Sequence, residues 1–226
     1  MRRIMAAAIL LAVPASATVS LLRCLTFSLK APLNAVFGAK NKLPGNWTLR
    51  KQSAILEKTD FKAAENPCEN WTWVAAIVAM AAARGAHIEQ QYLIDRLYGG
   101  SVCAPLAVNV ESLARQISRD YVLPDGQKFR LEAQFRAGAP TQTDPLIVAM
   151  RQNRPLMLLW NSRTYLLTGV NYDEYTAPTG NKLLIVTELK LFDSAANAPK
   201  RELTFSRETD NPNDLNGVLD LNIYPK

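Results

Sequence analysis

The chain has 226 residues, of which 48% are hydrophobic and 20% are charged, and its formal net charge is +6. This length fits one domain of ordinary size, and the composition supplies a sizeable core, which excludes disorder throughout the chain. The charge is mild and no basic run is interleaved with aromatic residues, so we expect no nucleic-acid binding. One histidine and three scattered cysteines lack the ligand spacing of a zinc site, and we expect neither a metal nor a cofactor.

Residues 1–17 have the three zones of a secretory signal. The charged start with Arg2 and Arg3 precedes an apolar run and a site of small residues, so we predict cleavage after Ala17. Loss of both arginines lowers the formal charge from +6 to +4. We therefore expect an exported protein, either periplasmic or secreted. The alternative is a membrane anchor over residues 4–22, because the apolar character continues beyond the cleavage site toward the roughly 20 residues of a membrane span.

Residues 18–59 show no sustained hydrophobic period, and glycine and proline interrupt them, so we predict a loosely structured region. Its basic character favours a solvated linker, with weak contact to an anionic surface as the alternative. The charges in and just after this region are Lys30, Lys40, Lys42, Arg50, Lys51, Lys58 and Lys62. One folded domain is then expected over residues 60–226.

A central helix is predicted near the start of that domain. Residues 71–83 are apolar on all sides but are too few to cross a bilayer, which indicates a helix buried within the domain. We expect Asn70 to be its N-cap and Gly85 to end it.

The rest of the domain changes from helical to strand periodicity along the chain. The expected elements are helices over 88–98 and 110–118, the latter capped by Asn109, a strand over 128–134, a short helix from Asp144 to Asn153, and strands over 156–160, 165–172, 183–192 and 218–224. Helices followed by strands indicate an α+β fold.

The three cysteines predict one disulfide in an exported protein, with one cysteine left over. We pair Cys68 with Cys103, because both lie inside the predicted core and Cys24 precedes it. The bridge would close a loop of about 36 residues and stabilise the fold by about 3–4 kcal/mol.

The most specific segment is residues 66–76, Asn-Pro-Cys-Glu-Asn-Trp-Thr-Trp-Val-Ala-Ala. It resembles the start of the central helix in papain-like cysteine peptidases of the small secreted bacterial type, related to the double-glycine-peptidase-like group. The pattern there is roughly Gln-x-x-x-(Asn/Glu)-Trp-Cys-Trp-Ala-Ala. Further similar segments are Tyr98-Gly99-Gly100, Ala114 to Ile117, Asn153 to Leu156 and Leu166 to Tyr172. The resemblance covers about residues 66–195 and implies a papain-like α+β fold.

The resemblance also implies where catalytic residues would lie. In the family, a cysteine at the first turn of a buried helix is the nucleophile, because the helix dipole lowers its pKa. A histidine acts as base, an Asn or Asp orients it, and an upstream glutamine stabilises the oxyanion. The nucleophile position falls on Thr72 and the glutamine position on Asn66. The histidine position falls on Arg163, or on Thr164 if the alignment slips by one, and the orienting residue is retained as Asp193.

These replacements predict a pseudoenzyme. The hydroxyl of Thr72 has far too high a pKa to ionise at neutral pH without a strong adjacent base, and Arg163 is not a base. The sole histidine, His87, is expected in a surface turn between two helices. We therefore expect a catalytically inactive homologue that binds a peptide or protein, or has an accessory role.

Trp71 and Trp73 allow two interpretations. They could line a groove that holds an extended peptide, or they could pack the start of the central helix. Two other functions stay open: an active peptidase with a non-standard nucleophile, and a structural envelope protein of unrelated fold.

Overall fold

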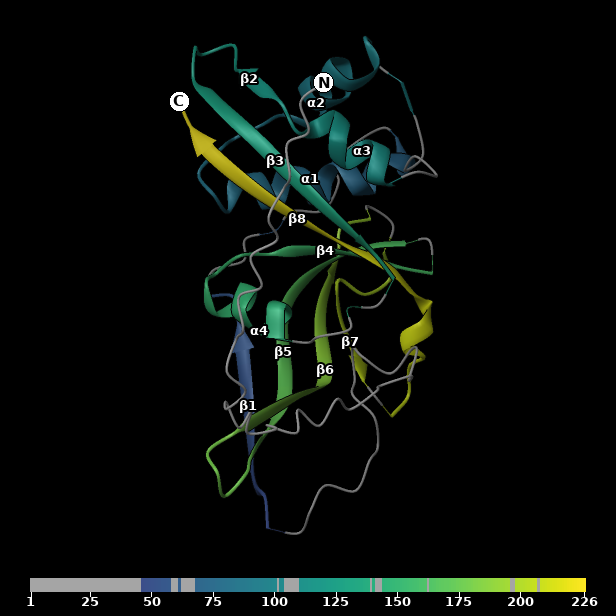
Figure 1. Ribbon diagram of the computed structural model, residues 1–226. Helices are drawn as coiled ribbons and strands as arrows, with labels where there is room; N and C mark the ends of the chain where they lie inside the picture. The colour runs from purple at the N-terminus through teal and green to yellow at the C-terminus, as the bar shows by residue number, and fades with distance from the viewer. Residues whose placement is uncertain are drawn as a thin grey trace, which may run out of the picture. The chain divides into compact units, whose positions relative to one another are not determined.

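A computed structural model describes residues 46–57, 61, 68–100, 102–103, 110–138, 140, 144–161, 163–195, 198–206 and 208–226. The predicted signal, most of the basic region, Asn66 and Asn109 lie outside the described residues. The described part is an α+β fold, with helices packed on an eight-stranded antiparallel sheet (Figure 1).

The helices and strands follow the chain in this order: β1 Thr48–Ile55, a 3₁₀ turn η1 Glu69–Trp71, α1 Thr72–Ala82, α2 Gln90–Tyr98, α3 Val110–Ile117, β2 Asp120–Val122, β3 Lys128–Ala137, α4 Asp144–Arg151, β4 Leu156–Trp160, β5 Arg163–Thr176, β6 Lys182–Asp193, β7 Glu202–Ser206, a second 3₁₀ turn η2 Pro212–Asp214, and β8 Leu215–Pro225.

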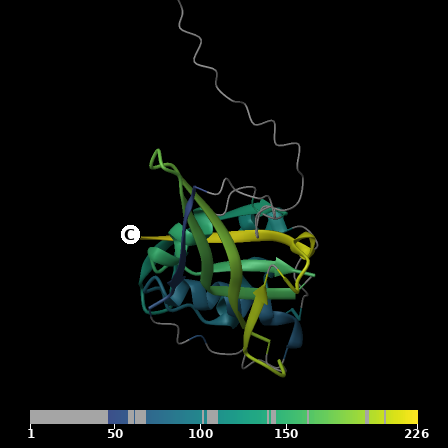
Figure 2. The same cartoon turned by 90° about the horizontal axis from the view of Figure 1, so that it is seen from below.

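The sheet has the strand order β2-β3-β8-β4-β5-β6-β7, so the last strand, β8, lies inside the sheet. The 14 residues of β5 pair with two strands along one edge. Residues 163–167 pair with β4, and residues 169–176 pair with β1. Figures 1 and 2 both show β1, in purple, running beside β5.

Two cores lie on opposite faces of the sheet. Helices α1, α2 and α3 share the first core with Met157 and Leu159 of β4, and α4 shares the second with Leu156 and Leu158. Because successive side chains of a strand point to opposite faces, this division places α4 across the sheet from the other helices. Every residue of β4 is buried, which explains its uninterrupted apolar sequence.

The central helix is present, but its start differs from the prediction. Asn70 lies within the 3₁₀ turn η1 and does not cap α1, which begins at Thr72. The turn forms because the Trp71 amide donates to the Cys68 carbonyl at 3.2 Å, one turn before α1 begins. At the other end Gly85 has a φ of +83°, and the helix stops three residues before it, as the glycine predicts.

The domain begins earlier than predicted, because β1 belongs to the sheet. Its eight residues pair with β5 without a register shift, so a loosely structured region up to residue 59 is wrong for this segment. Arg50 and Lys51 are therefore exposed strand residues and not part of a linker. Only Ala54 within β1 is buried, which leaves no hydrophobic period for the sequence to reveal.

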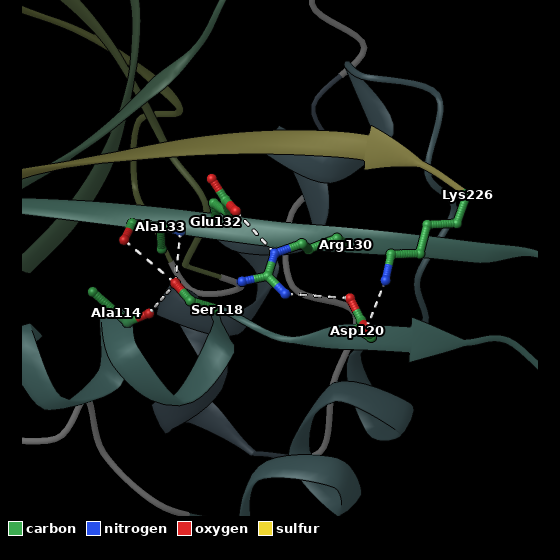
Figure 3. A network of polar contacts seen from close by, with 7 residues as sticks. All are labelled: Ala114, Ser118, Asp120, Arg130, Glu132, Ala133 and Lys226. Atoms are coloured by element: carbon green, nitrogen blue, oxygen red, sulfur yellow. Dashed lines mark hydrogen bonds and ion pairs between the residues drawn. The ribbon is translucent and has the colours of Figure 1, made fainter.

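A polar network joins α3 to the sheet (Figure 3). The Ser118 hydroxyl donates to the Ala114 carbonyl at 2.7 Å and accepts from the Ala133 amide at 2.9 Å. Next to it, the Asp120 carboxylate accepts from the Lys226 ammonium at 2.6 Å and lies 3.6 Å from the Arg130 guanidinium. Ser118 therefore fixes the end of α3 against β3 with hydrogen bonds on both sides.

The disulfide joins Cys68 to Cys103, the pairing expected from the sequence. Cys68 is buried next to η1, whereas Cys103 is exposed in the connection after α2. The same connection accepts a hydrogen bond of 3.0 Å, from the Trp71 indole nitrogen to the Val102 carbonyl. The covalent bond and the hydrogen bond together fix the chain just before α1.

Candidate functional site

Thr72 is the first residue of α1 and is half-buried. Among the described residues, no side chain caps the start of this helix or of the preceding turn η1. The positive end of the helix dipole is therefore directed at the position predicted for a nucleophile. This placement suits a thiolate, but a threonine hydroxyl there has no comparable tendency to ionise.

The end of β6 lies against Thr72. The hydroxyl of Ser194, which is fully buried, donates to the Thr72 backbone carbonyl at 3.0 Å. The neighbouring Asp193 is the last residue of β6 and is also buried. One of its carboxylate oxygens accepts a hydrogen bond of 2.9 Å from the Ala195 amide, which fixes its orientation.

Arg163 begins β5, close to the same strand end. Two residues later, Tyr165 stands opposite Asp193 in the antiparallel pairing of β5 with β6. Burial raises the pKa of Tyr165; the nearby Arg163 guanidinium lowers this pKa and the Asp193 carboxylate raises it. The Tyr165 phenol therefore stays protonated at neutral pH. Arg163 itself is exposed, whereas Thr164, the alternative position for the histidine, is buried.

The register of the sheet separates the predicted catalytic positions between its two faces. Arg163 stands opposite Trp160 and Asp193 stands opposite Tyr165, and both partners belong to the core beneath α4. Because opposed side chains share a face, the Arg163 and Asp193 side chains lie on the face of the sheet away from α1. Only Ser194, next to Asp193 in the chain, contacts Thr72. The fourth predicted position, Asn66, lies outside the described residues.

The sequence did not single out Ser194, Tyr165 or Arg201 as functional residues. Arg201 donates to the carbonyls of Asp193 and Ala195, so it holds the turn that follows β6. Ser194 and Tyr165 lie next to predicted positions, and this adjacency was the only available signal. Nothing in the sequence indicates Arg201, because its contacts depend on how the chain returns after β6.

Of the two interpretations of Trp71 and Trp73, packing of the helix start agrees with the structure and a peptide-binding groove does not. Both side chains are buried in the core of α1, α2 and α3, and Trp73 has no accessible surface. The Trp71 indole also donates to the Val102 carbonyl. These tryptophans pack the start of the helix and offer no face to a peptide.

The only histidine is remote from this place. His87 is exposed and follows the far end of α1, whose 11 residues span about 16 Å. It therefore cannot act as a base for Thr72.

The described residues contain no group of three or more His, Cys, Asp or Glu side chains that could hold a metal ion. None of the described helices combines the length and apolarity needed to cross a membrane. No protein family model matches the chain. Searches of curated proteins and of solved structures find no similar protein either.

Proposed function

We propose that this chain is an exported, catalytically inactive homologue of papain-like cysteine peptidases that binds a peptide or protein ligand or acts as an accessory protein. The observation that carries the proposal is the contact between Ser194 and Thr72. It joins the start of α1 to the residue that follows Asp193, although 121 residues separate Thr72 from Asp193 in the sequence.

The order of the elements also supports the resemblance. A buried helix comes first in the domain's helical half, and antiparallel strands from the second half of the chain follow it. The α1 helix shares its core with Met157 and Leu159 of β4 and Leu219 of β8. A buried helix that packs against the β-rich half favours this interpretation over a structural envelope protein of unrelated fold.

The chemistry of the site argues against hydrolysis. Thr72 needs a base, but the Arg163 guanidinium, the protonated Tyr165 phenol and the Asp193 carboxylate lie on the face of the sheet away from α1. Guanidinium and protonated phenol accept no proton at neutral pH. An active peptidase with a non-standard nucleophile therefore lacks a partner for its nucleophile.

The test restores the lost chemistry. The mature protein and a Thr72→Cys, Arg163→His variant, both with Cys24→Ser, are incubated with a broad peptide library. We expect no cleavage by the parent protein. Cleavage by the variant would show that the geometry for nucleophile and base persists. Cleavage by the parent that Thr72→Ala abolishes would overturn the proposal.

Thiol reactivity provides a control that does not depend on finding a substrate. Thr72→Cys is compared with Thr204→Cys, an exposed position on β7, in their rates of alkylation across pH. The positive dipole at the start of α1 should favour the thiolate at position 72, so that variant should react at lower pH than the control. Equal pH profiles would contradict a site of the papain-like type.

A further inference from the structure

The longest free edge of the sheet belongs to β1. Within the part of the chain that the structure describes, β1 pairs with β5 and with no other strand. The other two edge strands are shorter, because β2 has three residues and β7 has five. An exposed edge of eight residues offers a row of backbone donors and acceptors for another strand.

The backbone pattern identifies the groups that point outward. The Leu56 amide donates to the Thr168 carbonyl of β5 at 2.9 Å, and the pairing continues along β1 without a register shift. In an antiparallel pair, alternate residues face the partner strand. The even-numbered residues of β1 therefore bond to β5. The outward N–H and C=O groups belong to Leu49, Lys51, Ser53 and Ile55.

The side chains of these four residues share one face of the sheet. Leu49 and Ile55, near the two ends of β1, are 46% and 48% exposed. Lys51 and Ser53 lie between them and are also exposed. The edge thus carries an apolar residue at each end and polar residues in the middle, a pattern that is complementary to itself.

We propose that two copies of this chain associate through β1, in an antiparallel pair with its two-fold axis at Gln52. In this register Leu49 lies opposite Ile55 of the partner subunit, and Lys51 lies opposite Ser53 of the partner subunit. Each pair occurs twice, as a two-fold interface requires. The inference does not rest on the proposed function, because β1 lies outside the site around Thr72.

Neighbouring registers fit less well. The outward-facing residues of one copy must pair with the outward-facing residues of the other. The two-fold axis can therefore move along β1 only in steps of one whole residue. With the axis at Lys51, the two lysines would lie directly opposite each other, which is destabilising. With the axis at Ser53, Lys51 would face Ile55, and Leu49 would lose its apolar partner. The axis at Gln52 is the one that pairs apolar with apolar residues and separates the lysines.

Lys51 nevertheless makes the interface sensitive to salt. Charged side chains on edge strands oppose association, and the two Lys51 side chains lie diagonally across the proposed axis. Because salt screens such repulsion, the dimer should strengthen as ionic strength rises. An interface dominated by attraction between opposite charges would show the reverse.

Cross-linking tests the register. In the proposed pair, Gln52 faces its own copy at a position without hydrogen bonds, where opposed side chains come closest. Gln52→Cys, in a Cys24→Ser background, should form an intermolecular disulfide under mild oxidation. Arg50→Cys is the matched control, because it is exposed and shares a face of β1 with Gln52 but lies opposite Ala54 of the partner subunit. Equal cross-linking of the two variants, or none, would overturn the register.

Sedimentation of the mature protein over a series of concentrations tests the dimer itself. We expect a monomer–dimer equilibrium that Ser53→Pro weakens by about tenfold or more, because the proline removes one outward donor from each copy. The far-UV spectrum should not change, since this donor is unused in the single chain. A parent protein that sediments as a monomer throughout would overturn the proposal.

Discussion

The Ser194 hydroxyl donates a hydrogen bond of 3.0 Å to the backbone carbonyl of Thr72, 122 residues earlier in the chain. Ser194 follows the last residue of β6, and Thr72 begins α1. The bond therefore joins the start of the central helix to the end of a long strand.

Removing this bond should destabilise the fold without altering the rest of the core. For Ser194→Ala we expect a loss of about 1 kcal/mol in the free energy of unfolding, measured by urea denaturation. Ser206→Ala is the control, since its hydroxyl contacts the exposed Thr209 hydroxyl, and it should change stability by less than about 0.5 kcal/mol. Equal effects of the two substitutions would mean that the Ser194 contact contributes nothing.

The disulfide should contribute substantially to stability. Its cysteines are 35 positions apart, and replacing both by serine should lower the free energy of unfolding by about 3–4 kcal/mol. The measurement is guanidinium denaturation of the Cys68→Ser, Cys103→Ser variant with and without reductant. The parent protein in reductant should match the variant, and reductant should not affect the variant. A parent protein that loses no stability on reduction would contradict this prediction.

Tyr121 should cause a loss of stability at alkaline pH. Burial is the main cause that raises its pKa to about 12, against an ordinary value near 10. The folded protein therefore retains the phenolic proton at pH values where the unfolded chain loses it. This contribution is complete below about pH 10 and is lost between about pH 10 and 12, at up to about 1.4 kcal/mol per pH unit.

The comparison of Tyr121→Phe with Tyr224→Phe checks this origin. Tyr121 is buried, stacks on Phe129 and donates to the Ile117 carbonyl, whereas Tyr224 is exposed. Stability measured by chemical denaturation across pH should fall less steeply above pH 10 only in Tyr121→Phe. The same steep fall in both variants would assign the alkaline loss to other groups.

Arg154 and Asp220 form a largely buried ion pair. The effect on stability of replacing one partner should depend strongly on whether the other is present. Their side chains are 18% and 14% exposed, and Arg154 Nε and Asp220 Oδ1 are buried without a hydrogen-bond partner among the described residues. Each single change to alanine leaves one charge poorly solvated, so we expect a cost on the order of 3 kcal/mol. The double variant should cost clearly less than the two single costs combined. A double-mutant cycle by urea denaturation measures this coupling, and additive costs would contradict it.

The sequence predicts those elements whose burial leaves a periodic or continuous apolar pattern. Strand β4 is a continuous apolar run, and its bounds are as expected. Strand β1 was missed because it lies at an edge and buries only Ala54. The short strands β2 and β7 were also missed, since each has too few buried residues for a pattern.

The candidate site was predictable only where local sequence determines position. Thr72 and Asp193 are at the ends of a recognisable helix and strand, and both were placed from the sequence. The roles of Ser194 and Arg201 depend on contacts between distant segments, which no local pattern records. Trp71 is buried in the core and its indole donates to Val102, 31 positions away, contacts that the sequence could not distinguish from exposure to a ligand.

The interior position of β8 constrains when the chain can fold. This strand separates β3 from β4, so the segment with β2 and β3 joins the rest of the sheet only through residues 215–225. During synthesis the sheet must therefore stay open, with unpaired edges on β3 and β4, until those residues have left the ribosome. A nascent chain lacking them would expose strand edges to aggregation or to chaperones. The native sheet can therefore form only once β8 is available to pair with β3 and β4.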